Sequence, residues 1–363
     1  MSLYKVHETQ IDTGAWASAA TVQTDLLRNG PITRIEATVE VIPSATLAGA
    51  NQPNGLFSVI QNLTVGAGGQ TYFTLPADTA GGRAGVLLHY LNQWDGFGLG
   101  HSRGQITNPS RLYNPVTFVL HAGSRRRKPN GDDNPFDLSA FIPASKLGRL
   151  TAQWVATTND AMDDTVTISS AVIRYAVDQV LASSEAELRA EMASQGVLAA
   201  MQPSWDAERY AQSATATFYS DRRNIPVGGF IRRIALGSFD DTATRPVRAQ
   251  DQVTGISIEL PREGRYLYRG FVDSHLAHLP PASFTVADDV ASVFGLQAPE
   301  GIYVVDLRNH TTHHNPMGAD YGVDARAYGR GDILLGFTIT LNTSGDHTLI
   351  LYERYVEISG PLL

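Results

Sequence analysis

Short segments rich in β-branched and aromatic residues recur along the 363-residue chain, and they restrict its fold more than any other feature. Glycines and prolines separate these segments, as is typical of strands joined by turns. The pattern predicts strands within residues 32–42, 114–123, 148–158, 164–177, 229–239, 301–309, 332–342 and 347–358. They form two clusters rather than an alternation with helices, so we expect an all-β chain.

Helical patterns are few. In residues 183–201, Ser183 or Ser184 can cap a first turn in which Glu185 and Glu187 are favourable, and apolar residues recur at a spacing of three to four. This segment follows the first strand cluster, so we predict a connector between two lobes. Weaker helical patterns at 84–94 and 286–295 hold comparable places in the two halves.

The two strand clusters match each other in order, which indicates an internal duplication. Arg34 lies in the first strand of one cluster and Arg233 in that of the other, and a glycine turn follows each, at Gly69 and at Gly264. The remaining matches are segments 116–123 with 302–309 and the Arg-Tyr pairs 174–175 with 354–355. A long all-β chain can also match itself by chance, so a shared strand order is the test.

A unit of this size favours an eight-stranded antiparallel sandwich closed as a jelly roll. The length suits two lobes, at roughly 150 residues per domain. We therefore predict an N-terminal extended arm over 1–29, a first jelly roll over 30–178, a helical linker over 179–215 and a second jelly roll over 216–363.

Composition excludes several classes of protein. The chain has no cysteine, which removes disulfide frameworks, thiolate nucleophiles and cysteine metal sites. Its net charge of -8 argues against nucleic-acid binding that is independent of sequence. No segment approaches the ~18 consecutive apolar residues of a membrane span, and the first residues lack the pattern of a secretory signal. We expect a chain that is neither membrane-spanning nor secreted by such a signal.

Two jelly rolls joined by a helix resemble the double-jelly-roll major capsid proteins of tailless icosahedral viruses, the lineage of tectiviruses, corticoviruses and adenoviruses. The residues that carry the resemblance are the glycine hairpins LTVGAGGQTYF and IELPREGRYLYRG and the closing strands AVIRYAV and LILYERYVE. The loops are modest, so the chain looks most like the compact bacteriophage members.

The resemblance implies a structural coat protein that is not an enzyme and uses no cofactor. It implies homotrimers of pseudo-sixfold outline, or pseudo-hexameric capsomers, with strands upright to the shell and loops facing outward. The expected partners are neighbouring capsomers, minor capsid proteins and an internal membrane, but no specific nucleic-acid sequence. The expected location is the virion capsid, after assembly in the host cytoplasm.

Three groups of polar or charged residues could bind metal ions or anionic partners. His310, His313 and His314 share one loop and are weak candidates for a metal site, although a polar surface loop explains them more simply. The acidic pairs at 163–164, 240–241 and 288–289 could hold structural calcium but also suit turns. The basic run 125–128 could face nucleic acid or an anionic membrane, or form a solvated loop.

Two further functions stay open. GHSRG at 100–104 matches the nucleophile-elbow pattern formally, but loop-like sequence on both sides argues against a hydrolase. In a carbohydrate-binding or glycan-active double sandwich, Trp94, Trp154 and Trp205 would form a sugar platform with surface tyrosines. A spike or tail module is the remaining alternative.

Overall fold

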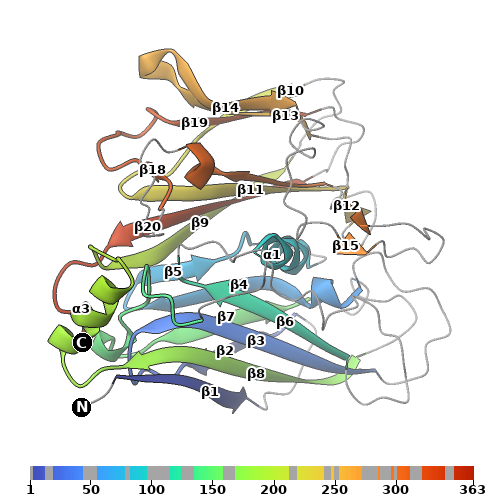
Figure 1. The fold of residues 1–363 in the computed structure, drawn as a ribbon. Helices are drawn as coiled ribbons and strands as arrows, with labels where there is room; N and C mark the ends of the chain where they lie inside the picture. Colours follow the sequence, from blue (N-terminus) through green and yellow to red (C-terminus); the bar gives the residue numbers. More distant parts are fainter. Residues whose placement is uncertain are drawn as a thin grey trace.

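The structure is a computed structural model that consists mainly of strands in four large antiparallel sheets. These sheets form two lobes, the first at the bottom and the second at the top of Figure 1. The prediction of an all-β chain is confirmed. The described residues are 3–12, 19–43, 55–77, 82–95, 114–123, 135–157, 168–211, 219–240, 247–248, 253–271, 285–286, 296–297, 301–310, 321–339 and 347–363.

The first lobe pairs its strands as sheet A, in the order β1-β8-β3-β6, and sheet B, in the order β2-β7-β4-β5. Its strands are β1 (Tyr4–Asp12), β2 (Thr21–Asp25), β3 (Ile32–Pro43), β4 (Ile60–Ala67), β5 (Gln70–Thr74), β6 (Asn114–His121), β7 (Thr151–Ala156) and β8 (Ile168–Leu181). Helix α1 (Arg83–Trp94) lies between β5 and β6, and the 3-10 turns are η1 (Gly55–Val59) and η2 (Ala144–Lys146).

The second lobe pairs its strands as sheet C, in the order β9-β20-β11-β17, and sheet D, in the order β10-β19-β13-β14. Its main strands are β9 (Met201–Ala211), β10 (Tyr219–Asn224), β11 (Phe230–Asp240), β13 (Val253–Leu260), β14 (Arg265–Phe271), β17 (Ile302–Asp306), β19 (Leu334–Ile339) and β20 (His347–Glu357). Shorter elements are β12 (Val247–Arg248), β15 (Thr285–Val286), β16 (Leu296–Gln297), β18 (Val323–Asp324), η3 (Pro261–Glu263) and η5 (Leu307–His310).

Strand order is the same in the two lobes. In each, the first, eighth, third and sixth main strands form one sheet, and the second, seventh, fourth and fifth form the other. This arrangement is an eight-stranded jelly roll. The predicted duplication therefore meets its test, and chance similarity does not account for it.

The duplication extends to single residues of the third strand. Arg34 pairs in register with Asp178 of β8, and Arg233 pairs with Glu353 of β20. A bulge precedes each arginine, between Ile32 and Arg34 in one lobe and between Ile231 and Arg233 in the other. The matched arginines thus mark one structural position, where a bulge aims a cationic side chain at an acidic one.

Gly30 and Gly229, which precede the matched arginines in the two lobes, lie where the backbone of a neighbouring strand leaves room only for a small residue. A Cβ atom on Gly30 would lie 2.4 Å from a backbone oxygen of β8, and one on Gly229 would lie 2.3 Å from a backbone oxygen of β20. The Gly-rich turn between β4 and β5 has a different requirement, because Gly68 and Gly69 have φ of 56° and 87°. The predicted glycine hairpin is therefore present.

Helix α3 (Glu185–Ser194) joins the lobes, as predicted for 183–201. The Ser184 side chain accepts a hydrogen bond from the backbone of Glu187, and Gly196 at φ 72° follows the helix and ends it earlier than expected. The predicted helix at 84–94 corresponds to α1, whereas nearly all of 286–295 lies outside the described residues.

The predicted domain limits need correction. The segment 1–29 is not a separate arm, because β1 pairs with β8 and β2 with β7 inside the first lobe. The linker is shorter than 179–215, because β8 continues to Leu181 and β9 pairs with β20 from Met201 onward. The missed strands β1, β2 and β9 all lie at sheet edges, where polar residues on one side obscure the strand pattern.

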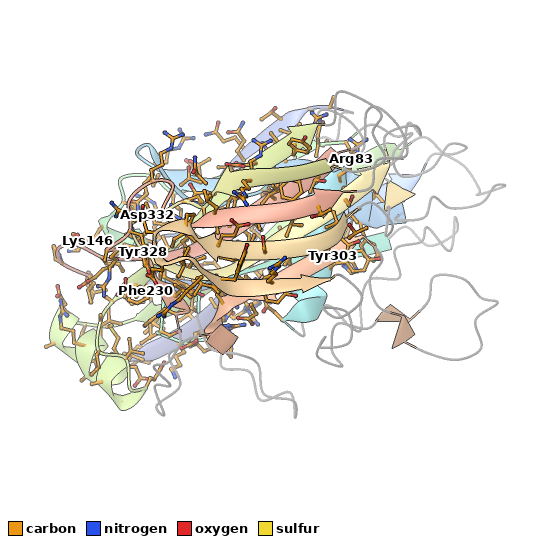
Figure 2. All side chains as sticks on the ribbon, turned by 90° about the horizontal axis from the view of Figure 1, so that it is seen from above. Arg83, Lys146, Phe230, Tyr303, Tyr328 and Asp332 are labelled. Carbon is orange, nitrogen blue, oxygen red and sulfur yellow. The ribbon has the colours of Figure 1, made fainter. Side chains whose placement is uncertain are left out.

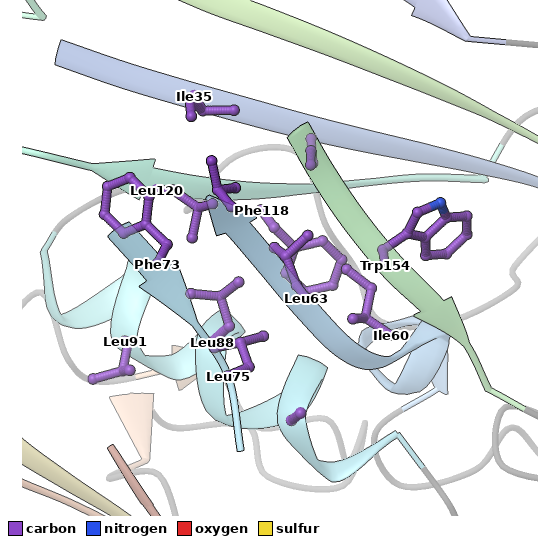
Figure 3. Packing of buried hydrophobic residues seen from close by; sticks show 14 of the residues in the cluster. Ile35, Ile60, Leu63, Phe73, Leu75, Leu88, Leu91, Phe118, Leu120 and Trp154 are labelled. Carbon is purple, nitrogen blue, oxygen red and sulfur yellow. The ribbon is translucent and has the colours of Figure 1, made fainter. Parts of the chain in front are cut away.

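Both lobes have buried cores. In the first lobe, Leu63 and Phe118 pack between the sheets, and Leu88 and Leu91 of α1 extend this cluster (Figure 3). Both termini and α3 lie at one end of the molecule in Figure 1. In the view from above, Figure 2 places Lys146 at this end and Tyr303 farther along the strands. Neither α-helix in the described part is long and apolar enough to span a membrane.

Candidate functional site

The predicted ion sites fall mainly outside the described residues. The backbone of His310 ends η5, while His313 and His314 lie beyond the described part, as does the basic run 125–128. Asp240 ends β11, and the other predicted calcium ligands are likewise outside. Within the described ranges, no three His, Asp or Glu side chains come together as a metal site would require. The metal and calcium sites stay predictions.

The proposed sugar platform conflicts with the structure. Trp154 is 2% exposed and Trp205 is 5% exposed, so neither indole offers a face to a sugar in water. Trp94 lies at the end of α1, and its side chain is outside the described set, as is the segment 100–104. A platform built on Trp154 and Trp205 is therefore wrong, because both side chains fill hydrophobic cores.

The most distinctive buried feature is the contact between the lobes, where α1 and β5 pack on one face of sheet C. The rings of Phe73 on β5 and Trp205 on β9 meet edge to face, with their centroids 4.9 Å apart. Beside them, Ala235, Phe239 and Leu351 of sheet C belong to the same core as the first lobe. Shared apolar burial stabilises the contact between the lobes.

A charged cluster lies within this contact. Asp95, which follows α1, accepts two parallel hydrogen bonds from Arg233, at 2.8 and 2.7 Å. Arg232 Nη2 lies 3.3 Å from Asp95 Oδ1. From β20, a Glu353 oxygen lies 2.7 Å from Arg233 Nη2, and the other lies 3.4 Å from Arg232 Nη1. One carboxylate of the first lobe thus bridges two arginines of the second.

Another buried pair sits beside this cluster. Arg308 donates to both oxygens of Asp306, from Nε at 2.9 Å and from Nη2 at 2.7 Å. Asp306 is also the register partner of Arg233 across β17 and β11. Three carboxylates therefore face three guanidinium groups, and the formal charges balance within the cluster.

Electrostatics keep the cluster ionised. Burial raises the pKa of Asp95, but the combined charges of Arg233 and Arg232 hold it below its usual range. Burial lowers the pKa of Arg233, whereas Asp95 and Glu353 raise it by more, so the net shift is upward. A proton donor or acceptor for catalysis needs a pKa near the working pH. These shifts suit a fixed ionic contact instead.

Two tyrosine hydroxyls also link the lobes. Tyr355 donates to the carbonyl oxygen of Gly123 at 2.9 Å and accepts a hydrogen bond from Arg232 at 3.1 Å. Tyr321 donates to the carbonyl oxygen of Ser139 at 2.6 Å. These bonds fix the relative orientation of the lobes, which apolar contact alone does not specify.

The outer face of sheet A is polar by contrast. His7 Nδ1 lies 2.6 Å from one oxygen of Asp178, and Arg34 Nε donates to the other at 2.6 Å. Farther along the same face, Arg174 pairs with Glu40. This face lies on the side of the first lobe opposite sheet B.

Sequence reasoning found part of the cluster and missed the rest. Arg233 was marked by its match to Arg34, and Arg232 adjoins it. Glu353 was missed, because the sequence match of Arg174–Tyr175 with Arg354–Tyr355 is out of register: the strand pairings place Glu353, and not a residue further along the chain, at the position of Asp178. Asp95 gave no signal, because its partners lie far away in the sequence.

Comparison with solved structures gives full-length matches. The first is to a crystal structure of the STIV MCP, with 14% identity, a TM-score of 0.66 and coverage of 98% of this chain and 97% of that one. The major capsid protein P2 from bacteriophage PM2 matches with 10% identity, a TM-score of 0.52 and coverage of 98% of both chains. The PBCV-1 virus capsid matches with 10% identity, a TM-score of 0.55 and coverage of 98% and 94%.

The chain is a double-jelly-roll protein. The match extends over both lobes and the helix between them, so the predicted fold is confirmed as a whole. No protein-family model matches the sequence, and no curated protein matches it. The double-jelly-roll fold is thus evident from strand order and three-dimensional similarity, at identities too low for sequence comparison to detect.

Proposed function

We propose that this double-jelly-roll protein is the major capsid protein of an icosahedral virus. The observation that carries the proposal is the full-length structural similarity to capsid proteins from several viruses, with both lobes and their connector matched. The buried contact between the lobes supports it, because a shell subunit must hold its two halves in one fixed arrangement.

Three copies of the chain would form a homotrimer, and this homotrimer would be the pseudo-hexameric capsomer. Neighbouring capsomers and minor capsid proteins complete the shell, which is assembled in the host cytoplasm. Six similar lobes in three chains would present a nearly sixfold outline for tiling. The role requires no catalytic step and no cofactor, and an internal membrane would lie beneath the shell.

The test is the mass of the purified, full-length chain in solution, measured by mass photometry, together with binding to a glycan array. We expect a species of three times the chain mass that binds no glycan. A chain that stays monomeric at every concentration and binds glycans would instead favour a carbohydrate-binding protein and overturn the proposal.

A further inference from the structure

The loop that leads into β3 contains a chemically reactive dipeptide, Asn29–Gly30. In an Asn-Gly pair the backbone nitrogen of the glycine can reach the asparagine side-chain amide, because glycine has no Cβ to keep the two groups apart. Packing requires the glycine, since a Cβ on Gly30 would lie 2.4 Å from the backbone oxygen of Val180. We propose that Asn29 is a latent deamidation site, which the folded first lobe holds closed and which converts when this corner of the lobe opens. The site does not depend on the proposed coat function.

The chemistry needs only water as a second reactant. The Gly30 nitrogen loses its proton to solvent and attacks Cγ of Asn29; the new bond from nitrogen to Cγ replaces the bond from Cγ to Nδ2, which leaves as ammonia. Water then opens the succinimide ring, at Cγ to give aspartate or at the backbone carbonyl of residue 29 to give isoaspartate. One amide and one water thus become one carboxylic acid and one ammonia. Asn29 is exposed, so water reaches its side chain.

Gln179 of β8 holds the attacking nitrogen. Its Oε1 accepts hydrogen bonds from the backbone N–H groups of Asn29, at 2.9 Å, and of Gly30, at 3.2 Å. Two consecutive N–H groups that share one acceptor fix the rotation about the Cα–C bond between them, so the Gly30 nitrogen does not turn toward Cγ. Gln179 is fully buried, and water therefore does not replace it as the acceptor.

Glu8 of β1 holds the other side of the reaction. Its Oε2 accepts from Asn29 Nδ2 at 3.5 Å and from Gln179 Nε2 at 3.5 Å. The leaving group and the residue that holds the attacking nitrogen therefore share one carboxylate. Loss of Glu8 frees the Asn29 side chain, and loss of Gln179 frees the Gly30 nitrogen.

This corner of the first lobe can open from a sheet edge. β1 is the outer strand of sheet A, and each of its residues whose burial the structure describes is exposed or half-buried. Such strands open locally at a lower free energy than central strands do. Gln179 pairs in register with Val6 of β1, so loss of β1 also uncovers the part of β8 that holds the site closed. Conversion of Asn29 therefore does not require unfolding of the whole chain.

The second lobe lacks the reactive residue. Gly229 occupies the place of Gly30, since a Cβ there would lie 2.3 Å from a backbone oxygen of β20, but the residue before it is Gly228. Packing thus demands the glycine in both lobes, whereas the asparagine occurs in one. The duplication assigns the site to the first lobe alone.

Conversion prevents the corner from closing as before. Aspartate at position 29 places a second carboxylate beside Glu8, where the native amide donates a hydrogen bond. Isoaspartate lengthens the backbone next to Gly30, where there is no room even for a Cβ. A chain that opens and converts is therefore marked permanently.

Peptide mass spectrometry of the full-length chain measures the conversion. We expect Asn29 to deamidate at least about tenfold more slowly in the folded chain than in concentrated urea, at the same mildly alkaline pH and temperature. The Asn-Gly pairs at 54–55 and 130–131 give reference rates in urea. Equal rates at Asn29 in the two conditions would overturn the closed state, and no conversion of Asn29 in urea would overturn the site itself.

Gln179→Met tests the residue that holds the nitrogen, since it keeps the length of the side chain and removes the acceptor. We expect conversion of Asn29 in the folded variant to rise at least about fivefold, because two hydrogen bonds are lost. Gln153→Met, on the exposed face of sheet B, is the matched control and should leave the rate unchanged. A Gln179→Met variant that is folded by circular dichroism and converts no faster than the control would contradict the proposal.

Glu8→Ala keeps the test decisive if Gln179→Met does not fold. Glu8 lies on an edge strand and is half-buried, so its replacement leaves the core intact. We expect the rate at Asn29 to rise at least about twofold, because the hydrogen bond that holds the leaving amide is lost. An unchanged rate in the folded Glu8→Ala variant would overturn the role of this corner.

Discussion

Asp95→Asn is expected to lower the free energy of unfolding by about 3 kcal/mol. The change keeps the shape of the side chain and removes the charge that bridges Arg232 and Arg233. Removing one partner of a buried ion pair costs about 3–5 kcal/mol, because the other charge stays buried. Glu353 still faces both arginines, and Asp95 is 14% exposed, so the lower end of this range applies.

Urea denaturation followed by tryptophan fluorescence provides the assay, since Trp205 lies in the contact between the lobes. With an m-value of about 3 kcal/mol/M or more, the loss corresponds to a midpoint shift of roughly 1 M or less. The matched control is Asp25→Asn. Its pair with Arg149 is about half exposed on both sides, so we expect a change below about 1 kcal/mol.

The double variant Asp95→Asn with Arg233→Met sharpens this test. It removes one charge of each sign and leaves Arg232 facing Glu353. Buried ion pairs replaced as a unit cost less than the loss of one member, so we expect the double variant to recover part of the stability. The reasoning is refuted if Asp95→Asn shifts the midpoint no more than Asp25→Asn does.

Three further outcomes follow from the structure. Because the pKa of Asp95 is lowered in the folded state, its stabilisation should be present above about pH 4 and lost as the pH falls further; acid titration of stability should therefore be shallower for Asp95→Asn than for the natural chain. Gly30→Ala and Gly229→Ala should each cost about 1–3 kcal/mol in urea denaturation through backbone overlap, whereas Gly148→Ala, where a Cβ meets nothing within 4 Å, should change little. Burial raises the pKa of Tyr355 to about 12, so its stabilisation should be lost as the pH rises from about 10 through 12, and Tyr355→Phe should reduce that alkaline loss; an unchanged alkaline profile would contradict the buried hydroxyl.

The sequence predicted the parts of the fold that local pattern specifies. The alternating segments 32–42 and 229–239 form β3 and β11. The turn at Gly69 forms a hairpin, as predicted, because its positive φ favours glycine. The Arg34 and Arg233 match located equivalent positions in two lobes. Duplication was readable because the strand anchors follow one order in both halves of the sequence.

Other features depend on distant partners and had no local signal. β1 and β9 were missed because edge strands need only one apolar side, and their pairing with β8 and β20 spans most of a lobe. Asp95 is an ordinary acidic residue after a helix until the fold brings Arg233 to it. The carbohydrate-binding alternative required Trp205 at the surface, whereas lobe packing buries it against Phe73.

Electron microscopy of the assembled, purified chain tests the central claim most directly. A double-jelly-roll coat subunit should appear as particles of three chains with six similar lobes around one axis. Particles that contain one chain at every concentration, or oligomers without a ring of six lobes, would contradict it.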